Sequence, residues 1–267
     1  MGIFLGSDEG LMLLQDTWTL IDCPLHQVTH AACTDGAIAA LDDSQHLLWL
    51  SGHLLSCDRD VEALQLWQGH ALVLSSDTDC LSIADKDGWL VTTRIGMYPQ
   101  DMCITGDTVC ICGGADGLVH LLTLPELHTM ATFPVPGQAQ RIHVAGQTAY
   151  VLCAAESDGL RCRLCRLDLS DGRCRPLSEL PGLAGAVRMD VNGVWVAASE
   201  TLVHFPFDHS SPDCVFGGFG LIRHIDVQGS YALITDPVAE LCALVTLSPE
   251  PEAAVLRHGM TGQAGFF

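Results

Sequence analysis

The chain has 267 residues, of which 48% are hydrophobic and 16% charged, a composition that fits extensive burial and excludes a disordered chain. It carries 32 acidic residues against 12 lysines and arginines, and its formal net charge of −20 argues against nucleic acid and anionic membranes as partners. No uninterrupted apolar run approaches the roughly 18 residues of a membrane-spanning helix. No basic leader precedes the strand-like start, and the 13 cysteines resemble free thiols in apolar strands, so we expect a cytoplasmic protein.

Seven glycines recur along the chain at intervals of 33 to 47 residues: Gly2, Gly36, Gly69, Gly106, Gly146, Gly193 and Gly229. Each is followed by a short apolar run, such as residues 71–74 or 108–112, and these runs are too short for helices and rich in strand-forming residues. The glycines are therefore expected at tight turns between strands, where positive φ costs a glycine little. A strand-containing repeat of this length is typical of a β-propeller.

Two more strands follow in each repeat, for example residues 81–84 and 89–95 in the third. Four strands in each of seven repeats predict an all-β, seven-bladed β-propeller in which residues 1–267 form a single domain. The blade repeats are expected at about 26–62, 63–100, 101–140, 141–186, 187–222 and 223–260. Residues 261–267 are expected to supply the innermost strand of a closing blade whose other three strands come from residues 1–25, which hides the edge strands.

Two alternatives stay open at this point. The segment from Val61 to Trp67 has the composition of an amphipathic helix, although its register with the other repeats favours a strand. A β-sandwich or an irregular β-barrel would use similar short strands.

Motifs for metal or nucleophilic chemistry are weak. Cys162 and Cys165 form a lone C-x-x-C pair, and because residues i and i+3 of a strand point to opposite faces, we expect a structural role. A calcium loop starting at Asp77 would need a glutamate where the chain has Gly88, so the acidic residues around it predict turns. No P-loop, dinucleotide fingerprint or nucleophile elbow occurs, and we expect no cofactor and no metal.

The best candidate site lies on the first strand of each repeat, which lines the channel of a propeller. In the fifth, sixth and seventh repeats, residues two and four positions before the glycine are apolar, as at Val191, and residues three and five positions before it are polar. This polar set and the loops beside it supply Tyr98, Asp101, Arg141, His143, Arg188, Asp190, Arg223, His224 and Asp226. Grouped arginines can bind an anionic ligand bidentately, whereas an ion-pair network with Asp190 or Asp226 is the structural alternative.

The segment from Arg94 to Ile111 contains a strand, a Gly-x-x-Pro turn, an inner strand and an apolar run, and it resembles the junction of YVTN-type bacterial β-propeller repeats. The segment from Phe133 to Leu152 is similar. The resemblance implies a seven-bladed propeller of the surface-layer-like or lactonase-like kind, a group that ranges from binding scaffolds to lactone hydrolases. The His, Arg and Glu set of lactonase-like members has no residue-by-residue match, since Glu62 lies in a blade distant from Arg188 and His224. The Trp-Asp ends of WD repeats are absent.

We therefore expect a non-enzymatic scaffold that binds a protein partner or a small anionic ligand at the channel mouth and, as a closed ring, is a monomer. The alternative is a hydrolase acting on an anionic sugar lactone or a related acid. In that case Arg141, Arg188 and Arg223 would hold the anion, and His224, oriented by Asp226, would act as general base. Pairing of all three arginines with carboxylates would argue against an anion site.

Overall fold

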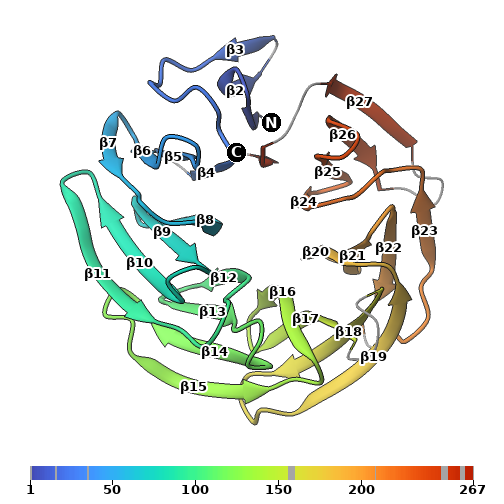
Figure 1. The fold of residues 1–267 in the computed structure, drawn as a ribbon. Helices are drawn as coiled ribbons and strands as arrows, with labels where there is room; N and C mark the ends of the chain where they lie inside the picture. Colours follow the sequence, from blue (N-terminus) through green and yellow to red (C-terminus); the bar gives the residue numbers. More distant parts are fainter. Residues whose placement is uncertain are drawn as a thin grey trace. The chain divides into compact units, whose positions relative to one another are not determined.

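The computed structural model describes residues 2–15, 17–34, 36–155, 160–207, 209–247, 252–258 and 262–266. These ranges contain seven four-stranded antiparallel sheets, the blades of the predicted all-β, seven-bladed propeller (Figure 1). Within them no helix has the length and apolar character needed to cross a bilayer. The chain divides into unit 1, which is Met1–Thr92 with His224–Phe267, and unit 2, which is Thr93–Arg223.

Unit 1 holds four blades. Blade 1 has the strand order β28-β1-β2-β3, with β28 Ala264–Phe266, β1 Ile3–Ser7, β2 Gly10–Leu14 and β3 Trp18–Leu20. Blade 2 comprises β4 His30–Thr34, β5 Ala37–Asp42, β6 Leu47–Leu50 and β7 His53–Ser56, and blade 3 comprises β8 Val61–Trp67, β9 His70–Ser75, β10 Cys80–Asp85 and β11 Gly88–Arg94. Blade 7 comprises β24 His224–Gln228, β25 Tyr231–Asp236, β26 Leu241–Thr246 and β27 Glu252–His258.

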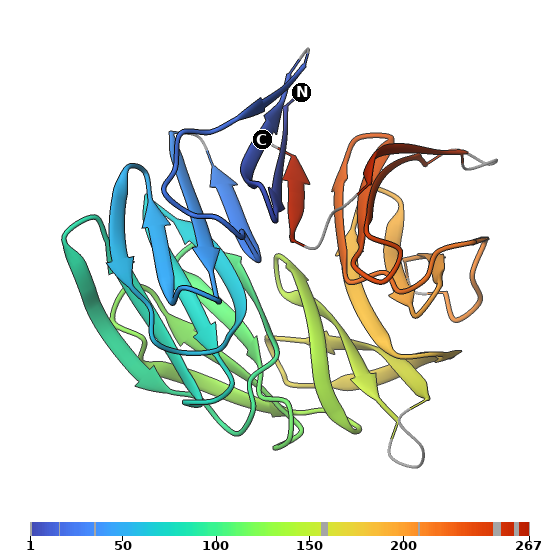
Figure 2. The same ribbon diagram turned by 45° about the horizontal axis from the view of Figure 1, so that its top comes forward.

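The C-terminal strand completes blade 1, as the sequence predicted. Strand β28 pairs antiparallel with β1, so that Phe266 lies opposite Ile3. Figure 2 shows the two strands side by side, β28 in red and β1 in dark blue. One blade is thus built from both ends of the chain, and β1 has a hydrogen-bonded partner on each side.

Unit 2 holds three blades. Blade 4 comprises β12 Asp101–Thr105, β13 Thr108–Cys112, β14 Leu118–Thr123 and β15 Thr129–Pro134. Blade 5 comprises β16 Gln138–Ala145, β17 Thr148–Ala154, β18 Arg161–Asp168 and β19 Cys174–Pro181, and blade 6 comprises β20 Ala184–Met189, β21 Gly193–Ala198, β22 Thr201–Pro206 and β23 Cys214–Gly217.

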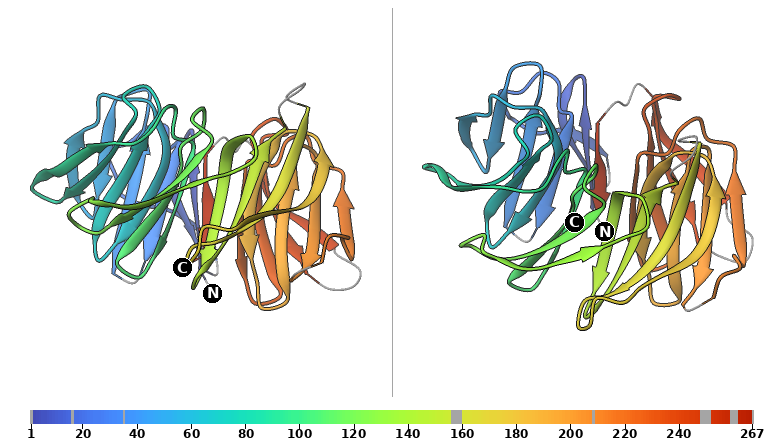
Figure 3. Two further views of the ribbon diagram at one scale, coloured as in Figure 1. Left: turned by 90° about the horizontal axis from the view of Figure 1, so that it is seen from below. Right: turned by 60° about the horizontal axis from the view of Figure 1, so that its bottom comes forward.

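Apolar side chains fill the spaces between neighbouring blades of a unit, which follows from strands that are buried on both faces. Blades 5 and 6 pack face to face (Figure 3), and their shared core includes Leu164 and Val196. Blades 4 and 5 share a second core that contains Cys165, whereas Cys162 belongs to the first. The two cysteines of the C-x-x-C pair therefore point to opposite faces of blade 5, as expected for a strand.

The segment from Val61 to Trp67 is strand β8 and not a helix, which confirms the argument from repeat register. Its alternating burial is that of a strand with one face in the core of blades 2 and 3. Cross-strand pairing with β9 overrides the helical propensity of its Glu, Ala, Leu and Gln residues.

Candidate functional site

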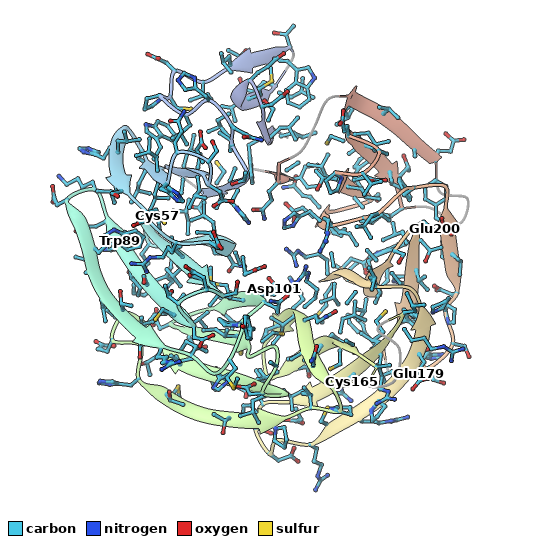
Figure 4. The ribbon with its side chains drawn as sticks, in the orientation of Figure 1. Cys57, Trp89, Asp101, Cys165, Glu179 and Glu200 are labelled. Carbon is cyan, nitrogen blue, oxygen red and sulfur yellow. The ribbon has the colours of Figure 1, made fainter. Side chains whose placement is uncertain are left out.

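The first strands of the three blades of unit 2 lie next to one another and carry four of the predicted polar residues. Asp101 begins β12, Arg141 and His143 lie on β16, and Arg188 lies on β20. Figure 4 shows Asp101 beside β16. Because Ile142 is fully buried in the core, its two neighbours on β16 project from the other face of the strand. The four residues are hereafter called the inner-strand site.

Asp101 fastens β12 to β16. One carboxylate oxygen, Oδ1, accepts the N–H of Met102 at 2.9 Å, and Oδ2 accepts the N–H of Ile142 on the next blade at 3.0 Å. Burial raises the pKa of Asp101, and the nearby guanidinium groups of Arg141 and Arg188 oppose this rise. An N–H donor at each oxygen and two cations nearby favour the ionised form of this carboxylate.

Arg141 is held by main-chain carbonyl groups. Its Nε donates to Gly185 O at 2.8 Å, and its Nη1 donates to Gln140 O at 2.7 Å and to Gln100 O at 3.3 Å. A Cβ at Gly185 would lie 2.1 Å from the Ile222 carbonyl oxygen, so a glycine is required where this strand and its neighbouring loop approach. Arg141 therefore joins β16 to β20 and to the link that precedes β12.

Arg188 has a much sparser set of contacts. Its Nη1 donates to Val187 O at 2.8 Å, and the other guanidinium nitrogens form no hydrogen bond in the described part of the chain. Within the same residues, no carboxylate lies within 4.0 Å of either Arg141 or Arg188. The structural alternative, in which Arg188 pairs with Asp190, is therefore not what the structure has.

His143 is neutral at pH 7. Burial and the neighbouring charge of Arg188 lower the pKa of its imidazole to about 3. A neutral imidazole carries one N–H donor and one acceptor nitrogen, so His143 adds hydrogen-bonding capacity and no charge to the inner-strand site.

Asp190 lies outside this group because β20 ends at Met189. Its Oδ1 accepts the N–H groups of Asn192 and Gly193, and its Oδ2 accepts the indole N–H of Trp195 at 2.8 Å. The residue belongs to the turn between β20 and β21, where the apolar Val191 is 89% exposed. The period-2 alternation that the alignment on Gly193 suggests therefore stops where β20 ends, at Met189.

Tyr98 and Arg223 lie in the links before β12 and after blade 6. Tyr98 has φ of +53°, an uncommon conformation for a bulky residue, and its ring is exposed. The neighbouring Met97 forms an isolated bridge with Gly114, which holds the Tyr98 link against the turn between β13 and β14. Arg223 is exposed at the end of unit 2.

His224 and Asp226 belong to β24 of unit 1. The Oδ1 of Asp226 accepts the N–H of Val227 at 3.0 Å, and its Oδ2 accepts the N–H of Phe266 at 2.9 Å. Asp226 thus fastens β24 to β28 by the same pair of contacts that Asp101 makes between β12 and β16. Both oxygens of the residue expected to orient His224 are occupied by main-chain groups.

The sequence did not point to the main-chain groups that complete the inner-strand site. The carbonyls of Gln100, Gln140 and Gly185 fix Arg141, and the Sγ of Cys103 accepts the N–H of Val144 at 3.3 Å. The one signal in the sequence was the adjacent small residues Ala184 and Gly185, which allow another backbone segment to approach β20 closely.

Two surface hollows lie away from the inner-strand site. A hollow of about 660 Å³ in unit 2 lies between blades 4 and 5 and is lined partly by Asp116, Val135 and Ala154. Another of about 490 Å³ lies against Trp49 in blade 2. Neither is lined by Asp101, Arg141 or Arg188. In the described residues, no three His, Cys, Asp or Glu side chains are grouped so that they could hold a metal ion.

No protein-family model and no curated protein sequence matches the chain. Solved structures do resemble it. A functionally unknown protein from Desulfotomaculum acetoxidans superposes with a TM-score of 0.76 at 13% identity, covering 98% of this chain and 97% of its own. A Bacteroides uniformis protein, provisionally assigned as a 6-phosphogluconolactonase, has a TM-score of 0.76 at 12% identity and covers 98% of both chains.

A third similar structure is virginiamycin B lyase from Staphylococcus aureus, with a TM-score of 0.69 at 10% identity over 86% of this chain and 84% of its own. At these identities the similarities establish the fold and carry no activity across. The chain is an all-β, seven-bladed β-propeller that resembles lactonase-like bacterial propellers in fold.

Proposed function

We propose that this protein is a non-catalytic binding propeller whose ligand is a small organic anion held at the inner-strand site. The observation that carries the proposal is Arg188, a half-buried guanidinium with no carboxylate within 4.0 Å among the described residues. Guanidinium groups pair bidentately with carboxylate or phosphate oxygens, and partial burial strengthens such pairs. In a chain of net charge −20, an unpaired cation of this kind is a preferred position for an anion.

The surroundings of Arg188 suit binding better than turnover. Asp101, the one carboxylate of the site, already accepts two main-chain N–H groups, and Arg141 is committed to carbonyls. His143 is held neutral with a pKa of about 3, so it is a weak general base at neutral pH. The inner-strand site therefore offers a cation and hydrogen bonds without an evident proton acceptor.

The test is a thermal-shift and calorimetric screen of mono- and dicarboxylates, sugar acids and their lactones against the wild type and Arg188→Gln. A ligand at 100 times its dissociation constant should add about 2.7 kcal/mol to the wild-type free energy of unfolding. We expect Arg188→Gln to lose this effect. The matched control Arg173→Gln removes the same charge from an exposed side chain of unit 2 and should keep it.

No shift with any acid, or equal binding by Arg188→Gln, would refute the anion site and direct the search to protein partners. Consumption of a lactone by the wild type, lost in His224→Gln, would instead support the hydrolase alternative.

A further inference from the structure

The inner-strand site contains an anion among its cations, and this limits the charge of a ligand. Arg141 and Arg188 contribute two positive charges, the ionised Asp101 carboxylate with an N–H donor at each oxygen contributes one negative charge, and His143 is neutral. Two minus one leaves a net charge of +1. A single negative charge on a ligand neutralises this group, whereas a second negative charge leaves an excess anion in a partly buried place.

Hydrogen bonds to the main chain hold the Asp101 carboxylate in place. Both of its oxygens are fixed by main-chain N–H groups, one on β12 and one on β16. Its charge acts on Arg188, the cation with free donors, without a direct ion pair between the two. The Asp101 carboxylate therefore cancels part of the attraction that the two guanidinium groups exert on an anion bound to Arg188, whereas the cost of desolvating that anion rises steeply with its charge.

The exposed Arg223 has little effect on the net charge that a ligand meets at the inner-strand site. It lies in the link after blade 6 and not on a first strand of unit 2, and solvent screens charges at such positions.

We infer that Asp101 is a specificity residue that makes the inner-strand site selective for monoanions, in particular small monocarboxylates, over dicarboxylates and phosphate dianions. This inference rests on the proposed function, because it concerns the ligand of the same site.

The test compares two ligands of nearly the same shape, succinamate with one negative charge and succinate with two, by calorimetry at neutral pH. We expect the wild type to bind succinamate at least about tenfold more tightly than succinate, the factor that about 1.4 kcal/mol of repulsion produces. Asp101→Asn raises the net charge of the site to +2, and this ratio should fall by about tenfold or reverse. Inorganic phosphate should gain affinity in the same variant.

Glu126→Gln is the matched control, since it makes the same charge change at an exposed turn of unit 2 and should leave the ratio unchanged. Asp101→Ser keeps a hydroxyl oxygen for the Ile142 N–H and replaces Asp101→Asn if that variant folds poorly. Equal or tighter binding of succinate by the wild type would overturn the inference while leaving the anion site intact. An unchanged ratio in both Asp101 variants would overturn it as well. Failure of every acid to bind would instead refute the proposed function.

Discussion

Two arginines at the same position of neighbouring first strands have different tasks. Arg141 donates three hydrogen bonds to carbonyls of three separate segments, whereas Arg188 donates one to its neighbour in the chain. Arg141→Gln should therefore lower the free energy of unfolding by about 2–3 kcal/mol, because it leaves partly buried carbonyls without a donor. Arg188→Gln should lower it by less than about 1 kcal/mol. Urea unfolding of both variants checks this, and equal losses would contradict the division of roles.

His143 predicts a pH dependence of stability. Its folded-state pKa of about 3 lies below the value of about 6.5 expected in the unfolded chain. As the pH falls from 6.5 toward 3, His143 becomes protonated in the unfolded chain but stays neutral in the folded protein. The free energy of unfolding therefore falls by up to about 1.4 kcal/mol per pH unit. The full contribution is present above about pH 6.5.

His143→Gln should flatten this part of the stability curve, measured as the difference from wild type in urea unfolding between pH 7.5 and 4.5. His53→Gln, an exposed histidine on β7, is the control. If His143→Gln follows the wild-type slope, the imidazole is not kept neutral by its surroundings.

At the level of elements, aspartates fasten the first strands of neighbouring blades. Asp101 joins β12 to β16 in unit 2, and Asp226 joins β24 to β28 in unit 1, each through one local N–H and one N–H on the next blade. An asparagine keeps only one acceptor atom, so Asp101→Asn and Asp226→Asn should each cost about 1–3 kcal/mol of unfolding free energy. Asp87→Asn, at an exposed turn, should change it by less than about 0.5 kcal/mol. If only one of the two variants loses unfolding free energy, the two aspartates do not have the same structural role, although their hydrogen bonds are alike.

The strand and blade pattern was predictable because it depends on local signals that recur seven times. Five of the seven glycines do have positive φ, namely Gly36, Gly69, Gly106, Gly146 and Gly229. Gly193 is different: it begins β21, and a Cβ there would lie 2.2 Å from the Phe205 carbonyl oxygen. A glycine can thus be required either for a positive φ or for close packing of the backbone, and the sequence does not distinguish these two causes. The alignment on Gly193 therefore did not show that β20 ends at Met189, before Asp190 and Val191.

The candidate site was only partly predictable for a related reason. Period-2 alternation placed Arg141, His143 and Arg188 on one face, and the repeat placed Asp101 beside them. Their partners, however, are backbone atoms of other blades, such as Gly185 O and Ile142 N. Every residue carries these groups, so composition and spacing give no signal for which of them a side chain will meet.

At the scale of the whole molecule, residues 262–266 connect three separate parts of unit 1. Strand β28 pairs with β1, the Gln263 carbonyl accepts the N–H of Gly6 at 2.9 Å, and the Phe266 N–H reaches Asp226 on blade 7. Gly262 is packed so closely that a Cβ there would lie 2.2 Å from the Val28 carbonyl oxygen. These residues therefore contact blade 7, blade 1 and the link to blade 2.

Deletion of residues 262–267 should consequently destabilise the protein more than Phe266→Ala, which removes one buried ring at a cost of about 3–5 kcal/mol but leaves the strand pairing in place. The deletion also leaves β1 as an open strand edge, which pairs readily with other chains. We expect a lower melting temperature than that of Phe266→Ala, together with concentration-dependent association in light scattering. Because Phe266→Ala lacks the ring but keeps the edge covered, it should stay as dispersed as the wild type. A truncated protein that melts like Phe266→Ala and does not associate would mean that β1 needs no partner strand, and that the closing strand acts only through its buried side chain.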